Sequence, residues 1–141
     1  IHGIVGLAEA MDLAYSDLEA HQEHVFGLKK HMMDSFKERF SDISFHGEIS
    51  YEKSLYTVLN VCFPETDKAA MLLFTLDLKG IAASGGSACS SGSAKGSHVL
   101  EGINANPNRP NARFSFSRYT TLAEIDYVVS QVVEIFKNKI V

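Results

Sequence analysis

The sequence has few of the features that cross-link a chain or hold it in a membrane. Cysteine occurs only twice in 141 residues. Two cysteines are too few for a disulfide framework, and these two do not have the spacing of a zinc site. No apolar run approaches the roughly 20 residues that a membrane helix needs, and no basic segment followed by an apolar one opens the chain. These absences predict a cytoplasmic protein that does not span a membrane.

The sequence also lacks an excess of positive charge and a starting methionine. Lys and Arg number 13 against 17 Asp and Glu, for a formal net charge of −4, so the chain offers no basic field that would hold a nucleic acid. The chain begins with Ile1 and has no initial Met, which suggests a piece cut from a longer polypeptide. The 45% hydrophobic and 21% charged content predicts one globular domain with a single core.

Apolar spacing predicts two helices near the start of the chain. The first covers residues 3–15, where apolar side chains recur at helical intervals. Ser16 to Glu19 then has the form of a capping box, which would start the second helix. That helix is expected to end near Lys37 and Arg39, which suit the negative end of a helix dipole. Its apolar stripe contains Leu18, Val25, Leu28, Met32, Phe36 and Phe40.

Three segments have the composition or the alternation of strands. They are residues 43–45, 56–63 and 112–117, and Pro64 ends the second. In the third segment, the period of two places Arg113 on the face opposite to that of three apolar residues. Those three residues are Ala112, Phe114 and Phe116.

Two further helices complete the predicted fold. One begins near Thr66 or Asp67 and stops at Gly80, so that the chain between residues 63 and 81 makes the one expected crossover. The other follows a second capping-box pattern at Thr121 to Glu124. Its inward face contains Ile125, Val128, Val129, Val132, Phe136 and Ile140. The prediction is a two-layer α+β domain, with helices on one face of a small, mainly antiparallel sheet.

Residues 84–97 are almost wholly Ser, Gly and Ala, and they contain Cys89. Because so little apolar surface offsets the entropy of ordering, we expect a mobile loop with a reachable thiol, with Lys95 and His98 as the nearest cationic side chains. Two other interpretations are an incidental surface cysteine and a phosphate cradle of backbone amides. The cradle is the weaker of these, because Lys95-Gly96-Ser97 reverses the Gly-Lys-Ser order of a Walker loop.

The loop and its surroundings resemble a known family. The run DLKGIAASGGSACSSGS from Asp77 to Ser93, followed by SHVL at residues 97–100, closely resembles the active-site segment of cysteine desulfurases of the NifS and IscS group. Other similar segments are Gly3 to Leu7, Leu59 to Val61, Arg113 to Ser115, Arg118 to Thr121 and Glu124 to Asp126. The resemblance covers nearly the whole chain, with the order of segments preserved.

This resemblance implies an enzyme. Family members are homodimers that use pyridoxal phosphate to convert L-cysteine to L-alanine and leave a persulfide on the loop cysteine. An acceptor or scaffold protein then takes the sulfur, for example in iron–sulfur cluster assembly. Cys89 occupies the position of the family nucleophile, and Arg113 that of the arginine that binds the substrate carboxylate, a task for which a planar guanidinium is suited.

The same resemblance places residues 1–141 as the C-terminal small domain. The lysine that binds the cofactor belongs to the family's large domain, so this chain alone should be inactive. Two departures from the family pattern concern the loop: Gly85 stands where many relatives have Ser, and Ala94-Lys95-Gly96 replaces a more usual Leu-Glu-Pro. The second change should loosen the far hinge of the loop.

Several other residues were candidates for a role. Cys62 on the second strand is expected to be a small buried thiol. His98 either stabilises the thiolate or caps a short helix, and Asn60 resembles a family strand residue whose role the sequence leaves open. Solvated helix polarity, rather than metal binding, is the expectation for His21, His24 and His31.

Two alternatives to a cysteine desulfurase remain at this stage. The rival from another class is a non-catalytic module that relays sulfur or docks a partner without a cofactor. Within enzymes, a selenocysteine lyase of the same fold group is the alternative, and the sequence Ser-Ala-Cys-Ser at residues 87–90 favours the desulfurase.

Overall fold

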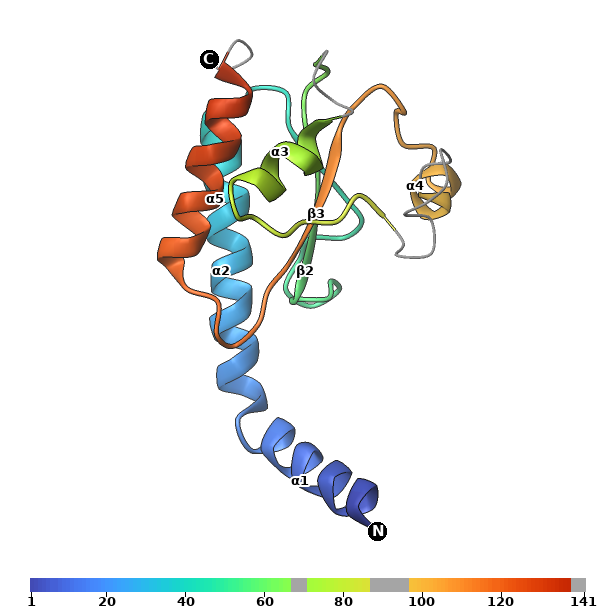
Figure 1. Ribbon diagram of the computed structural model, residues 1–141, viewed down its shortest axis with the longest axis vertical. Coiled ribbons are helices and arrows are strands. Elements are labelled where there is room, and N and C mark those ends of the chain that lie inside the picture. The colour runs from blue at the N-terminus through green and yellow to red at the C-terminus, as the bar shows by residue number, and fades with distance from the viewer. Residues whose placement is uncertain (67–70, 87–96, 138–141) are drawn as a thin grey trace.

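The computed structural model describes residues 1–66, 71–86 and 97–137. In these residues, α2 (Leu18–Arg39), α3 (Leu72–Leu78) and α5 (Leu122–Ile135) pack on one face of a three-stranded antiparallel sheet with the order β1-β2-β3 (Figure 1). The two-layer α+β prediction is confirmed. The elements are α1 (His2–Ser16), α2 (Leu18–Arg39), β1 (Ser44–His46), β2 (Val58–Cys62), α3 (Leu72–Leu78), α4 (His98–Gly102), β3 (Asn111–Ser115) and α5 (Leu122–Ile135).

The pairing of the strands gives the sheet two unlike faces. Phe45, Val61 and Ala112 form one row across β1, β2 and β3, and the last two of them are fully buried in the core. The next row is polar and consists of His46, Asn60 and Arg113. Because side chains alternate between faces along a strand, this polar row lies on the face away from the core.

Aromatic rings fill the space between the sheet and the helices. Phe63, which follows β2, stacks on Phe136 at the end of α5 with ring centroids 5.2 Å apart. Phe36 of α2 meets Phe63 edge to face at 5.5 Å, an arrangement that the ring quadrupoles favour. The predicted stripe on α2 is confirmed from Val25 to Phe40, whereas Leu18 is 40% exposed. The predicted inward residue Ile140 lies outside the described residues.

The ends of the elements differ in part from the predictions. The capping box predicted at Ser16 is wrong, because α1 continues to Ser16 and the Ser16 hydroxyl donates to Leu13 O at 3.1 Å. Asp17 is the N-cap residue of α2 and makes no side-chain capping bond. The capping box at Thr121 is confirmed, with Thr121 Oγ1 accepting from Glu124 N at 3.3 Å and Glu124 Oε2 accepting from Thr121 N at 2.8 Å.

Helix α3 begins later than predicted. Its N-cap residue is Met71 rather than the predicted Thr66, and Asp67, the other predicted cap, lies outside the described residues. Its end is as predicted: Gly80 has φ of +73°, a conformation that glycine adopts without steric cost. Strand β1 starts one residue later than the prediction of 43–45.

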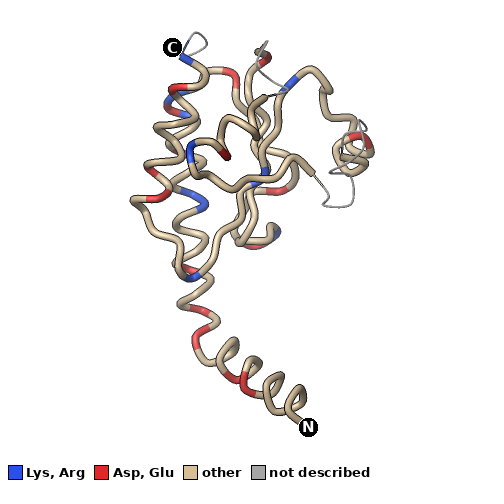
Figure 2. Tube along the Cα trace, viewed as in Figure 1, with Lys and Arg blue, Asp and Glu red and all other residues tan. Residues whose placement is uncertain are grey.

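Helix α1 projects from the rest of the domain (Figure 1). None of its residues is buried, and this includes large apolar side chains: Ile4 is 75% exposed and Leu7 is 63% exposed. Figure 2 shows acidic but no basic residues on this helix, and the first Lys or Arg of the chain is Lys29. Within the described residues, no helix is long and apolar enough to cross a membrane. The apolar surface of α1 is therefore open and flanked by negative charge.

Deleting residues 1–16 should leave the free energy of unfolding unchanged within about 0.5 kcal/mol, because α1 buries no side chain. Urea denaturation of the shortened and the intact chain measures this difference. The control is Phe36→Ala in the intact chain, which removes a fully buried ring and should cost about 3–5 kcal/mol. A loss above about 2 kcal/mol on deletion would show that α1 packs on the body of the domain.

Candidate functional site

The side chain of Arg113 makes few polar contacts with the described residues. It lies at the middle of β3, on the face of the sheet opposite the core, and it is half-buried. Among the described residues, its side chain makes one hydrogen bond, a long one from Nη2 to Ser84 Oγ at 3.5 Å. Within residues 1–66, 71–86 and 97–137, no carboxylate forms an ion pair with it. The guanidinium is therefore available to an external anion.

Arg109, four residues earlier, shows the contrasting case. Its guanidinium donates to Phe63 O at 2.9 Å, to Asp42 Oδ1 at 2.8 Å, to Asp42 O at 2.9 Å and to Cys62 O at 3.3 Å. These bonds fasten the turn before β3 to the end of β2 and to the residues before β1. Arg109 therefore has a structural role, although a surface cavity borders it.

The backbone of Ser84 pairs with the backbone of Arg113. Ser84 N donates to Arg113 O at 3.1 Å, and Arg113 N donates to Ser84 O at 2.6 Å, in an isolated antiparallel bridge. Since β2 is antiparallel to β3 as well, the segment that ends at Ser84 runs parallel to β2 on the other side of β3. The predicted crossover between residues 63 and 81 is thus confirmed, and it brings the start of the Ser/Gly/Ala segment to Arg113.

The two ends of the Ser/Gly/Ala segment are also in contact with each other. A Cβ atom placed on Gly86 would lie 2.8 Å from Ser97 Cβ and 3.4 Å from Ser97 Cα, so only glycine fits there without displacing Ser97. Ser84 Oγ donates to Gly86 O at 2.9 Å and so closes the turn that leads to this contact. Cys89, the predicted nucleophile, lies outside the described residues.

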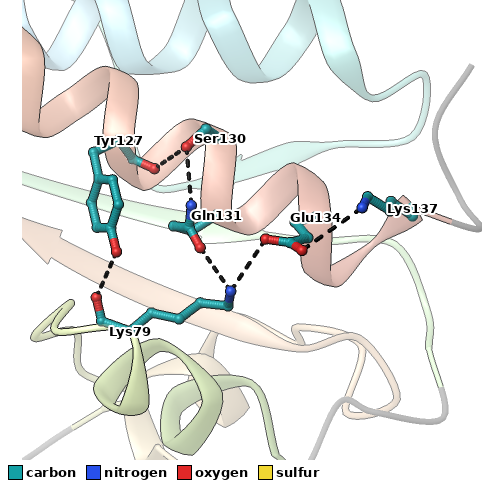
Figure 3. Close-up of polar contacts among 6 residues, drawn as sticks. All are labelled: Lys79, Tyr127, Ser130, Gln131, Glu134 and Lys137. Atoms are coloured by element: carbon teal, nitrogen blue, oxygen red, sulfur yellow. Dashed lines mark hydrogen bonds and ion pairs between the residues drawn. The ribbon is translucent and has the colours of Figure 1, made fainter.

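A polar network fastens the chain just before this segment (Figure 3). Tyr127 Oη donates to Lys79 O at 3.0 Å, and Lys79 Nζ donates to Gln131 Oε1 at 2.7 Å and to Glu134 Oε2 at 3.3 Å. The hydrogen bond and the charge of Lys79, with the charge of Lys137, hold the pKa of Glu134 below its usual value. The network joins the end of α3 to α5. The network was not predicted from the sequence, although positions 127, 131 and 134 have the spacing of one helix face.

Within the part of the chain that the structure describes, two polar atoms in the row of Arg113 are shielded from solvent and without a partner. They are Asn60 Oδ1 and His46 Nε2, on residues that pair directly across β2 and β1. Asn60 in turn pairs with Arg113. Sequence analysis noted Asn60 and missed His46, because the pairing of β1 with β2 depends on residues far apart in the chain. Cys62, two residues beyond Asn60, is 3% exposed, which confirms the prediction of a buried thiol.

The remaining histidines have separate surroundings. His98 is the first residue of α4 and is exposed, while Ser97 is the N-cap residue, so the alternative in which His98 caps the helix is wrong. His31 Nε2 contacts Asp126 Oδ1 at 2.7 Å, His24 Nε2 contacts Thr120 O at 3.1 Å, and His21 lies edge-on to a tyrosine ring. Among the described residues, no three His, Cys, Asp or Glu side chains form a metal-binding group.

Two lysine amines of the described residues are committed to contacts within the domain. Lys29 carries a buried amine, and burial lowers the pKa of that amine. Its Nζ donates to Ser54 Oγ at 2.9 Å and to Leu55 O at 3.0 Å, which fastens the loop before β2. Lys79 is bound in the network with α5. Neither lysine offers an uncommitted amine.

Comparison with known families and proteins agrees with this geometry. The family model of aminotransferase class-V matches residues 1–128, and the chain belongs to the aminotransferase class-V family. It is similar to the cysteine desulfurase IscS of Vibrio campbellii, with 35% identity over 133 residues, which are 93% of this chain and 31% of that protein. It is also similar to IscS of Pseudoalteromonas translucida, with 33% identity over 141 residues, which are 99% of this chain and 33% of that protein. The chain thus spans about a third of the length of these relatives.

Solved structures show the same fold. A NifS-like protein from Rickettsia africae superimposes with a TM-score of 0.73 at 21% identity, covering 95% of this chain and 34% of its own. Another NifS-like protein also gives a TM-score of 0.73, at 26% identity, and covers 96% of this chain and 33% of its own. The resemblance to cysteine desulfurases of the NifS and IscS group is confirmed.

Gly86→Ala should destabilise the domain by about 1–3 kcal/mol, because the new Cβ would displace Ser97. Denaturant unfolding gives the free energy, and the amide chemical shifts of Ser84 and Arg113 report whether their pairing is disturbed. The matched control is Gly27→Ala on α2, where a Cβ meets nothing within 4 Å and helix propensity predicts a gain of up to about 1 kcal/mol. Unchanged stability together with an unchanged Ser97 amide shift in Gly86→Ala would contradict the contact.

Proposed function

We propose that this chain is the domain of a pyridoxal-phosphate-dependent cysteine desulfurase that holds the substrate carboxylate and carries the sulfur. One observation carries the proposal. The Ser84 backbone is paired with Arg113, so the segment that contains Cys89 starts beside a guanidinium that has no acidic partner among the described residues. A nucleophile and an anion clamp at one place suit an enzyme that attacks a small amino acid.

Covalent geometry supports a shared target for Cys89 and Arg113. An extended chain spans at most about 3.5 Å per residue, and Cys89 is the third residue after Gly86. The Cα atom of Cys89 is therefore within about 10 Å of that of Gly86. Since Ser84 fixes this end of the segment to β3, the thiol is tethered close to the strand that presents Arg113.

The proposed reaction transfers one sulfur atom. Bound pyridoxal phosphate, held by a region of the full-length enzyme outside this chain, supplies the electron sink that weakens the bond between carbon and sulfur in L-cysteine. The Cys89 thiolate attacks the substrate sulfur, so that a sulfur–sulfur bond forms as the carbon–sulfur bond breaks. The electron pair stays with the substrate carbon, which takes up a proton. L-cysteine and the thiol thus become L-alanine and a persulfide on Cys89.

Arg113 has a different task in this proposal. Its guanidinium binds the carboxylate of L-cysteine through two parallel hydrogen bonds, which fix the orientation of the amino acid as well as its position. Its backbone is fixed in β3, and Ser84 Oγ contacts the guanidinium at Nη2. The persulfide on Cys89 then passes to an acceptor protein, with iron–sulfur cluster assembly as the proposed pathway, in a cytoplasmic homodimer.

Cys89→Ser in the full-length enzyme should abolish persulfide formation, because a hydroxyl cannot accept the sulfur, while L-cysteine still binds. The mass of the protein after exposure to L-cysteine measures the added sulfur, and a spectroscopic titration measures binding. Cys62→Ala is the matched control: Cys62 is 3% exposed, so its loss should leave the added sulfur in place. Full turnover by Cys89→Ser would overturn the role of this residue.

Arg113→Lys should keep the positive charge and lose the two-pronged geometry, so the apparent affinity for L-cysteine should fall by about 1–3 kcal/mol, or roughly 5- to 150-fold. Persulfide formation should persist at high L-cysteine, since the thiol is unchanged. Steady-state kinetics at varied L-cysteine separate the two effects. Arg39→Lys, an exposed change at the end of α2, is the control, and an Arg113→Lys affinity equal to that of the control would remove Arg113 from the site.

A further inference from the structure

The row of the sheet that contains Arg113 places a polar residue on each side of it. Ser84 pairs with Arg113 on one side, and Asn60 pairs with it on the other. His46 follows Asn60 in the same row. Directly opposed residues on adjacent strands have Cβ atoms about 4.5–5.5 Å apart, so Asn60 is within reach of the guanidinium and of the imidazole.

Only one of these neighbours is bonded to the guanidinium. Arg113 Nη2 makes the long contact of 3.5 Å with Ser84 Oγ. On the opposite side, Asn60 Oδ1 is shielded from solvent and accepts no hydrogen bond from any described residue, and His46 Nε2 likewise has no partner among them. A buried acceptor without a donor is unfavourable, and such atoms are few in folded proteins and call for an explanation.

We propose that Asn60 is a positioning residue for Arg113, which accepts an N–H of the guanidinium at Oδ1 when the substrate carboxylate is bound. An amide oxygen has two lone pairs, so the second one can accept from His46 Nε2. One arrangement then satisfies both unpartnered atoms. Ser84 and Asn60 hold the guanidinium from its two sides and fix the plane in which it meets the carboxylate. This inference rests on the proposed function and adds a residue to its carboxylate site.

Asn111 provides a matched control on the same face. Its Oδ1 is also shielded and without a partner, but it pairs with Cys62 in the neighbouring row, and its amide nitrogen donates to Arg109 O at 2.9 Å. It therefore shares the residue type and the burial of Asn60 but is bonded to the structural arginine. An effect of burial alone would be the same at both asparagines.

The test compares Asn60→Ala and Asn111→Ala in the full-length holoenzyme with L-cysteine as the probe. Asn60→Ala should raise KM about 3- to 10-fold and leave kcat at saturation unchanged, because the clamp loses its orientation while the thiol is intact. Asn111→Ala should leave KM unchanged. Asn60→Asp, which keeps the size of the side chain, should raise KM further than Asn60→Ala, since its carboxylate competes with that of the substrate for Arg113.

The decisive measurement is the double variant. If Asn60 acts through Arg113, Asn60→Ala should have little further effect on KM in an Arg113→Lys background. Equal fold-changes of KM in both backgrounds, an unchanged KM in Asn60→Ala, or an equal rise in Asn111→Ala would each overturn the inference. An Arg113→Lys enzyme with unchanged KM would overturn the proposed clamp and Asn60 with it, whereas a raised KM in Arg113→Lys with an unchanged one in Asn60→Ala overturns the Asn60 inference alone.

Discussion

Two hydrogen bonds between the backbones of Ser84 and Arg113 fix the start of the Ser/Gly/Ala segment beside the strand that carries the guanidinium. They join a segment that follows α3 to a strand that comes almost thirty residues later. Without this pairing, the start of the Ser/Gly/Ala segment would have no fixed relation to the guanidinium. The Lys79 network and the turn at Gly80 serve the same end, because they hold the chain that leads into Ser84.

Local patterns in the sequence predicted most of the fold. Alternation along β3 placed Arg113 opposite the buried Phe114, and apolar spacing on α2 predicted the buried stripe up to Phe40. The capping box predicted at Ser16 is wrong because α1 extends through that residue. In this helical position the Ser16 hydroxyl donates to Leu13 O instead. The same pattern at Thr121 succeeded, because Thr121 precedes α5 in an extended conformation with ψ of +157°.

The parts of the site that the sequence did not predict depend on contacts between distant residues. Ser97 meets Gly86 only because α4 returns to the end of the crossover, and His46 shares a row with Arg113 only through the registers of β1 with β2 and of β2 with β3. The periodic spacing of apolar residues within one segment does not predict which residues of two distant strands pair. The proposed role of Cys89, in contrast, came from the resemblance to a family, since the composition of the segment alone left an incidental surface cysteine as an alternative.

The stacking of Phe63 on Phe136 also has a consequence for biosynthesis. The two rings are 5.2 Å apart but far apart in the sequence, and the helix that carries Phe136 is synthesised after β3. A nascent chain that has emerged only as far as α4 has neither the strand that pairs with Ser84 nor the helix that covers Phe63. Its apolar sheet face is open, and such incomplete chains are prone to misassembly. The cysteine-bearing segment is therefore fastened to its strand late in synthesis, when nearly all of the domain has been made.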